Sequence, residues 1–194
     1  MMNREECLRV LHQFRQPSTV VVTTMGSVAP WSRLSNTALD FPAAGSAMAH
    51  AADFAMGIAL AQPNRQVWVL NGDGSMLMSL GTLVTICQTP PTNLVLFVLQ
   101  NNTYEVTGNQ PIPGAGRISM VQMAQAAGFI DAYEFVKPQD MLNQLPAVLA
   151  LAGPLFVNLH VKPGREAPPK LDCPLRDPAL QLRNAVLQPP RRGE

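Results

Sequence analysis

The turn Gly72–Ser75 (GDGS) is the part of the sequence best suited to hold a phosphate group and a divalent cation. It lies between an apolar run, Gln66–Leu70, that predicts a buried strand and a periodic segment, Met76–Cys87, that predicts a helix. Glycines let a ligand approach the backbone closely, and N–H groups at the start of a helix attract phosphate. Asp73 adds an oxygen ligand of the kind that Mg²⁺ uses together with substrate phosphates.

A second polar group follows the next apolar run, Leu94–Leu99, which also predicts a buried strand. This group is the segment Gln100–Tyr104 (QNNTY), and it includes Asn101. Because neighbouring parallel strands end at the same edge of a sheet, we expect Asp73 and Asn101 to face one cavity, although they are 28 positions apart (101 − 73). A strand-to-helix turn without a ligand would explain Gly72–Ser75 alone, but it would not explain the pair.

Two other phosphate-binding patterns do not fit this turn. A nicotinamide fingerprint needs G-x-G-x-x-G, and Leu77 stands where the third glycine would be. No lysine of the Walker type follows the turn either. The sequence therefore disfavours a dinucleotide site and a nucleoside triphosphate site.

Strand patterns alternate with helix patterns along most of the chain. We expect strands at 18–24, 66–70, 94–99, 133–136 and 155–161, and helices at 3–14, 46–61, 76–87, 121–127 and 138–151, with a short helix at 32–39. Strands that are apolar on both faces and separated by helices predict an α/β fold, a doubly wound parallel sheet with helices on both faces.

The length of 194 residues suits one domain, which we place at residues 1–162. Seven of the 18 prolines lie between Pro163 and Pro190, so residues 163–194 are expected to form a proline-rich tail, extended or lying along a partner. Charged residues make up 14% of the chain, against about 25% in an ordinary soluble domain, which suggests a surface covered by another subunit.

Charge and composition also bear on partners and location. The net charge of +1 gives no reason to expect nucleic acid binding, and no apolar run approaches the roughly 20 residues of a membrane span. The three cysteines are odd in number and widely spaced, which fits a reducing, cytoplasmic setting.

The G-D-G turn and the asparagine at the end of the next strand resemble the thiamine diphosphate motif. In that family the aspartate, the asparagine and a backbone carbonyl two residues later bind Mg²⁺, which holds the diphosphate. The resemblance implies Asp73, Asn101 and the carbonyl of Thr103 as metal ligands, with Asn102 as the alternative to Asn101. It implies cofactor contacts for Gly72, Asp73, Gly74, Ser75, Asn101 and Tyr104.

Two further segments are similar to the phosphonopyruvate and sulfopyruvate decarboxylases. The segment Ser46–Ala51 (SAMAHA) resembles their G-S-M-G-H-A, and Thr107–Pro111 (TGNQP) resembles their T-G-N-Q-P. The resemblance implies that Met48 props the cofactor into a bent shape and that the carbonyl of Ser46 accepts the pyrimidine amino group; core packing is the alternative for Met48. His50 is either an active-site donor or a histidine hydrogen-bonded at a helix start.

The family also needs a glutamate against the pyrimidine ring, and it comes from a separate pyrimidine-binding domain. The glutamates of this chain lie at helix starts, in loops or in the tail, so the resemblance implies a partner subunit that supplies this group. The assembly would be a homodimer or a hetero-oligomer with its site at the interface.

The resemblance implies the cofactor-binding subunit of a thiamine diphosphate- and Mg²⁺-dependent decarboxylase acting on a small 2-oxo acid. The alternatives are the matching subunit of an acetolactate synthase-like carboligase or of a 2-oxo acid oxidoreductase, and a non-catalytic thiamine diphosphate-binding module. Ser46 and Ala49 replace family glycines, and Glu105-Val106 replaces a small pair. A glutamate at position 105 would repel a phosphonate or sulfonate tail.

Overall fold

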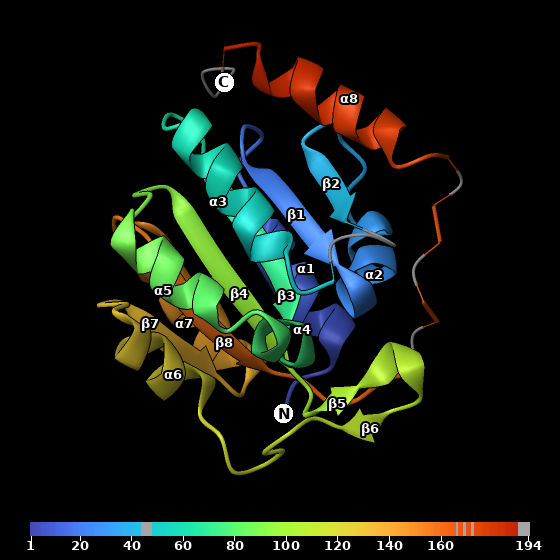
Figure 1. Ribbon diagram of the computed structural model, residues 1–194, viewed down its shortest axis with the longest axis vertical. Coiled ribbons are helices and arrows are strands. Elements are labelled where there is room, and N and C mark those ends of the chain that lie inside the picture. The colour runs from blue at the N-terminus through green and yellow to red at the C-terminus, as the bar shows by residue number, and fades with distance from the viewer. Residues whose placement is uncertain (44–47, 166, 169, 172, 190–194) are drawn as a thin grey trace.

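The computed structural model describes residues 1–43, 48–165, 167–168, 170–171 and 173–189. Its centre is a six-stranded sheet in which all neighbouring strands are parallel (Figure 1). Across the sheet the strands are β2 (Asp40–Ala43), β1 (Val20–Thr24), β3 (Val67–Gly72), β4 (Leu94–Gln100), β8 (Leu155–His160) and β7 (Ala132–Phe135). A small antiparallel hairpin, β5 (Thr103–Tyr104) and β6 (Gln110–Pro111), follows β4.

Helices cover both faces of the sheet, which confirms the predicted doubly wound fold (Figure 1). One face packs against α3 (Ala51–Ala61), α4 (Asp73–Met78), α5 (Gly81–Gln88) and α6 (Met120–Ala127). The other face packs against α1 (Arg4–Phe14), α2 (Val28–Ser32) and α7 (Pro138–Leu149).

The central strands are buried on both faces because their side chains alternate between two apolar cores. In β4, Leu94, Leu96 and Val98 pack into the core beneath α3 and α5, whereas Val95 and Phe97 pack into the core beneath α1 and α7. This continuous burial explains why the strand reads as an unbroken apolar run in the sequence.

Local capping signals account for several helix ends. The side chain of Asn3 accepts hydrogen bonds from the backbone N–H groups of Glu5 and Glu6, as its place before α1 predicts. Pro138 occupies the first position of α7, where no N–H is needed. Gly128 ends α6 with φ +115°, a conformation that glycine adopts without strain.

Three predicted elements were wrong in type or extent. The short helix expected at 32–39 lies earlier in the chain, as α2, and residues 33–39 lead without a helix into the edge strand β2. The helix expected from residue 46 begins at Ala51 in the described part. The segment 76–87 divides into α4 and α5, because Ser79 leaves the helical conformation and its hydroxyl donates to the carbonyl of Ala49.

The segment after residue 162 is not extended throughout, because it contains α8 (Arg176–Val186). Leu182 of α8 is buried in the core that α3 and β2 share, and the guanidinium of Arg65 donates to the carbonyls of Ala185 and Gln188. Pro178 is compatible with a helix here because the first turn needs no intrahelical N–H donor. The division into a domain at 1–162 and a tail at 163–194 stays a prediction.

Candidate functional site

A cleft that is open to solvent lies at the carboxyl ends of β1, β3 and β4. Ligands of doubly wound folds bind at this edge of the sheet. Most of the residues singled out in the sequence line it: Met48, Gly72, Asp73, Gly74, Ser75, Asn101, Thr103 and Tyr104. His50 is not among the lining residues, and Ser46 lies outside the described residues.

Asp73 is a buried carboxylate at the start of α4, directly after β3. Its Oδ1 accepts a hydrogen bond from the N–H of Gly74 at 2.9 Å, and its Oδ2 accepts one from the N–H of Asn102 at 2.6 Å. Burial raises the pKa of Asp73 above its usual value, and the backbone hydrogen bonds, that of Asn102 foremost, oppose this rise. The carboxylate is therefore held in one orientation at the cleft wall.

Asn101, at the end of β4, is buried and held from both ends of its side-chain amide. Its Oδ1 accepts from the N–H of Thr103 at 3.0 Å, and its Nδ2 donates to Oε2 of Glu105 at 2.8 Å. Asn102 turns away instead, since its Oδ1 accepts from Gln100 at 3.1 Å and it does not line the cleft. Asn101 is thus the better placed of the two asparagines to offer a cation its oxygen.

The ring of Tyr104 covers Gly74 at the floor of the cleft. A Cβ added to Gly74 would lie 2.5 Å from Cε1 of Tyr104, so only glycine fits beneath this ring. A Cβ on Gly72 would meet nothing within 4 Å, so this glycine faces open space. The hydroxyl of Thr103 donates to Oδ1 of Asn109 at 3.0 Å, which braces the hairpin that follows β4.

Met48 lies at the rim of the cleft, where its side chain is 43% exposed. Met48 is therefore not packed into either apolar core of the described chain. The next residue, Ala49, has φ +76°, and both of its backbone polar groups are bound by α4 and its C-terminal end. The N–H of Ala49 donates to the hydroxyl of Ser75 at 2.9 Å, and the carbonyl of Ala49 accepts a hydrogen bond from the hydroxyl of Ser79. Ser75 therefore positions the chain at Met48.

His50 does not reach the cleft. Its imidazole is 71% exposed, and its Nδ1 lies 2.9 Å from Oδ2 of Asp53 in the first turn of α3. Asp53 also accepts a hydrogen bond from the hydroxyl of Thr82 at 2.7 Å. These contacts match the structural alternative for this histidine, a hydrogen-bonded residue at a helix start.

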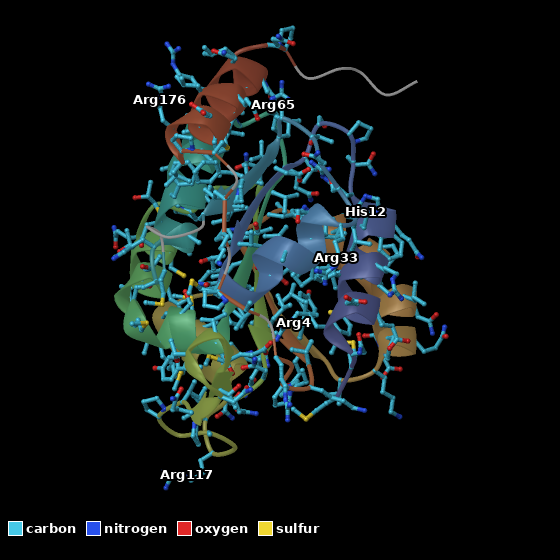
Figure 2. The ribbon with its side chains drawn as sticks, turned by 90° about the vertical axis from the view of Figure 1, so that its right-hand side faces the viewer. Arg4, His12, Arg33, Arg65, Arg117 and Arg176 are labelled. Carbon is cyan, nitrogen blue, oxygen red and sulfur yellow. The ribbon has the colours of Figure 1, made fainter. Side chains whose placement is uncertain are left out.

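The sequence pointed to Glu105 near the substrate, but it did not predict Arg4 as a residue of the cleft or the pairing of the two. Both are buried, and their side chains form an ion pair with Nη1–Oε1 at 2.9 Å. Figure 2 shows Arg4 pointing from α1 into the molecule, whereas Arg117 and Arg176 project at its two ends. The spacing of Arg4 with Leu8 and Leu11 places it on the apolar face of α1, a signal that could have found it.

The residues present fit a metal-bound diphosphate. Asp73 and Asn101 bring carboxylate and amide oxygens to one cleft, and hard oxygen ligands suit Mg²⁺. Thr24, at the end of β1, also lines the cleft, and its buried hydroxyl has no hydrogen-bond partner in the described part of the chain. A polar ligand would supply one. The N–H of Gly74 is already bound to Asp73, so phosphate would have to use other donors.

No helix among the described residues is both long enough and apolar enough to cross a membrane.

Two curated relatives are decarboxylases. The chain is 39% identical over 125 residues to the sulfopyruvate decarboxylase subunit beta of Methanothermobacter thermautotrophicus, a match that covers 64% of each chain. It is 35% identical over 156 residues to the phosphonopyruvate decarboxylase of Streptomyces viridochromogenes, covering 80% of this chain and 38% of that enzyme. The chain thus spans less than two thirds of the length of these relatives.

A solved structure shares the fold, and a family profile covers most of the sheet. The benzoylformate decarboxylase of Polynucleobacter necessarius superposes with a TM-score of 0.69 at 19% identity, over 86% of this chain and 34% of that one. Residues 23–159, from β1 to β8, match the family described as thiamine pyrophosphate enzyme, C-terminal TPP binding domain. The chain therefore belongs to this family of thiamine pyrophosphate enzymes.

Proposed function

We propose that this chain is the cofactor-binding subunit of a thiamine diphosphate- and Mg²⁺-dependent decarboxylase of small 2-oxo acids. One observation carries the proposal: Asp73 and Asn101, at the ends of adjacent strands, line the same cleft. Membership of the thiamine pyrophosphate family and two relatives named as decarboxylases support it.

In this proposal Asp73, Asn101 and the backbone carbonyl of Thr103 hold Mg²⁺, which in turn holds the diphosphate. Gly72 leaves room for the ligand, and the ring of Tyr104 packs over Gly74 beside it. Ser75 acts on the cofactor through the chain at Met48, because its hydroxyl accepts from Ala49. The side chain of Met48, at the rim, supports the bound cofactor in a bent shape.

When bound, the cofactor would supply an electron sink for the electron pair that stays behind as CO₂ leaves a 2-oxo acid. The chain's own residues bind and orient it. The carbonyl of Ser46 is proposed to accept its pyrimidine amino group. The side chain of His50 faces solvent, so its proposed role as an active-site donor requires that a partner subunit bring the substrate to the start of α3.

A partner subunit is proposed to supply the glutamate that activates the pyrimidine ring. Glu105 lines the cleft, but its carboxylate accepts from Arg4, Asn101 and Gly164, which leaves it unsuited to that task. Exposed apolar side chains on α3, α4 and α5 offer a surface for a second subunit: Phe54, Leu60, Met78 and Val84. The assembly is a homodimer or a hetero-oligomer.

The proposed substrate is a small 2-oxo acid like those of the relatives, sulfopyruvate and phosphonopyruvate. Glu105 is compatible with such an anion after all, because Arg4 compensates its charge. We place the enzyme in the cytoplasm, since all three cysteines are free thiols.

Calorimetry with thiamine diphosphate and Mg²⁺ tests cofactor binding by the full chain. We expect the wild type to bind thiamine diphosphate only with Mg²⁺ present, and Asp73→Ala to lose this binding while keeping its circular dichroism spectrum. Asp177→Ala, on the exposed side of α8, is the matched control and should bind as the wild type does. Equal binding by Asp73→Ala and the wild type would contradict the site.

Product analysis with the co-purified partner tests the reaction. Release of CO₂ and an aldehyde from a 2-oxo acid supports the decarboxylase. A carbon–carbon bond formed with an added aldehyde acceptor would point to a carboligase, and electron transfer to an acceptor dye would point to an oxidoreductase. Cofactor binding without turnover, with the partner present, would mark a non-catalytic module. Decarboxylation by the isolated, partner-free chain would refute the two-subunit proposal.

A further inference from the structure

Glu105 is a buried carboxylate, and each of its two oxygens accepts at least one hydrogen bond from a neighbouring donor. Oε1 accepts from Arg4 at 2.9 Å, and Oε2 accepts from Arg4, from Nδ2 of Asn101 at 2.8 Å and from the N–H of Gly164 at 3.1 Å. These donors come from α1, from the end of β4 and from the segment after β8. The carboxylate therefore joins three separate parts of the chain beside the cleft.

The side-chain amide of Asn101 lies between this carboxylate and a backbone donor. An ionised carboxylate can only accept hydrogen bonds, and the N–H of Thr103 can only donate one. The amide satisfies both neighbours in one orientation alone, with Nδ2 toward Glu105 and Oδ1 toward Thr103. If the amide turned over, it would face the carboxylate with its oxygen and lose both hydrogen bonds.

This orientation decides which atom of Asn101 a cation meets. The two ends of an asparagine amide are similar in size, but only the oxygen can bind a metal ion, and the NH₂ end would repel it. Groups that orient metal ligands in this way commonly matter to affinity almost as much as the ligands themselves.

Arg4 holds the Glu105 carboxylate in place, because the two buried side chains form an ion pair. The guanidinium binds both carboxylate oxygens and also donates to the carbonyl of Gly26 at 3.3 Å, which fixes its own place. A Cβ on Gly164 would lie 2.8 Å from Oε1 of Glu105, so the absence of a side chain lets this backbone approach the carboxylate closely.

We propose that Glu105, held by Arg4, is a positioning residue that fixes the Asn101 amide with its oxygen available to the cation. This inference rests on the proposed function and adds to it a role for the residue that departs from the family's small pair. It also makes α1 part of the metal site, because Arg4 begins that helix.

Two double variants test this role without leaving a buried charge unpaired. Arg4→Met/Glu105→Gln keeps an acceptor for Asn101 at position 105, whereas Arg4→Met/Glu105→Leu removes it at similar volume. Mn²⁺ replaces Mg²⁺, and electron paramagnetic resonance measures free Mn²⁺ at saturating thiamine diphosphate. Urea unfolding of both variants measures their stability, so that a general loss of folding is recognised.

We expect the Gln variant to bind Mn²⁺ within about threefold of the wild type and the Leu variant to bind about 10- to 100-fold more weakly, although both remain folded. A purely structural role would weaken both variants alike. Equal Mn²⁺ affinities for the two variants, beside a wild type that binds normally, overturn the inference and leave the proposed function standing. Failure of the wild type itself to bind Mn²⁺ and thiamine diphosphate overturns both.

Discussion

Oδ2 of Asp73 accepts a hydrogen bond from the backbone N–H of Asn102 at 2.6 Å, so the residue after β3 is tied to the residues after β4. The two strands pair in register as far as Gly72 and Leu99, and this hydrogen bond continues the connection past the end of the sheet. Asn102 has φ +62°, a conformation that asparagine tolerates better than most residues. The carboxylate and the neighbouring Asn101 amide thus keep a fixed relation before any ligand binds.

The raised pKa of Asp73 predicts how cation affinity depends on pH. A proton and a cation compete for the carboxylate, so affinity for Mn²⁺ should fall as pH is lowered through this pKa. The fall should begin at a higher pH than for an ordinary aspartate, whose pKa is about 3.9. Titration of Mn²⁺ affinity against pH measures it, and a decline confined to pH below about 3.9 would contradict the role of burial.

The same shift predicts the sign of the effect on stability. A carboxyl whose pKa is raised on folding binds its proton more tightly in the folded chain. Its contribution to the free energy of unfolding is therefore complete below the pKa of the unfolded chain and is lost as pH rises through the folded pKa. The difference in the free energy of unfolding between the wild type and Asp73→Ala should therefore change between the unfolded and the folded pKa of Asp73. Urea unfolding at a series of pH values measures this difference.

Substitution of Gly74 should damage the cleft as well as the fold. The new Cβ of Gly74→Ala would meet the ring of Tyr104 at 2.5 Å and Cγ2 of Ile112 at 3.2 Å, so the ring must move. We expect about 1–3 kcal/mol of lost stability and weaker thiamine diphosphate binding. Gly57→Ala is the control, since its Cβ meets nothing within 4 Å and should add about 0.5–1 kcal/mol to helix α3. Similar unfolding curves for the two variants would contradict this account.

Ala49 should tolerate glycine better than any alanine inside a helix. Its φ of +76° costs a residue with a Cβ about 1–2 kcal/mol, and glycine would remove this strain. Two effects oppose the gain: the buried methyl group is lost, and the unfolded chain has more conformational entropy. We expect Ala49→Gly to leave the free energy of unfolding within about 1 kcal/mol of the wild type. Ala55→Gly, at a buried position of α3, should lose about 2 kcal/mol. Equal losses would show that Ala49 is not strained.

Asp40 should be the residue on which the edge strand β2 depends most. It forms an ion pair with Arg15 at 3.0 Å in which both side chains are nearly buried, and it accepts from Trp31 at 3.0 Å and Ser35 at 2.6 Å. Asp40→Ala leaves the guanidinium buried and unpaired, which should cost about 3–5 kcal/mol. Glu5→Ala breaks exposed ion pairs and should cost less than about 1 kcal/mol. Thermal unfolding compares them, and similar losses would argue against a role for burial.

The sequence predicted the strands that carry the site because their pattern is local. Buried runs such as Leu94–Leu99 read directly as parallel strands, and the glycines around Asp73 marked the turn that follows one of them. The cleft formed by Asp73 and Asn101 then followed from topology alone. This part of the prediction needed no knowledge of side-chain packing.

Other features could not be predicted because they depend on contacts distant in the chain. Helical spacing places Arg4 on the apolar face of α1, but it does not reveal the partner, because Glu105 lies 101 positions away. Strand β2 contains Pro42 and has no run of β-branched residues; side-chain bonds to Asp40 hold it in place instead. Helix α8 packs Leu182 and neighbouring apolar residues against the core. The many prolines around this segment hid its helical pattern in the sequence.

The two outer strands, β2 and β7, are four residues long, and Pro42 in β2 has no N–H to donate. Such short edges, one of them interrupted by proline, resist edge-to-edge pairing with strands of other molecules. The sheet is therefore poorly suited to continue from one molecule into the next. Aggregation by sheet extension is disfavoured, which leaves the helical faces as the surfaces for the proposed assembly.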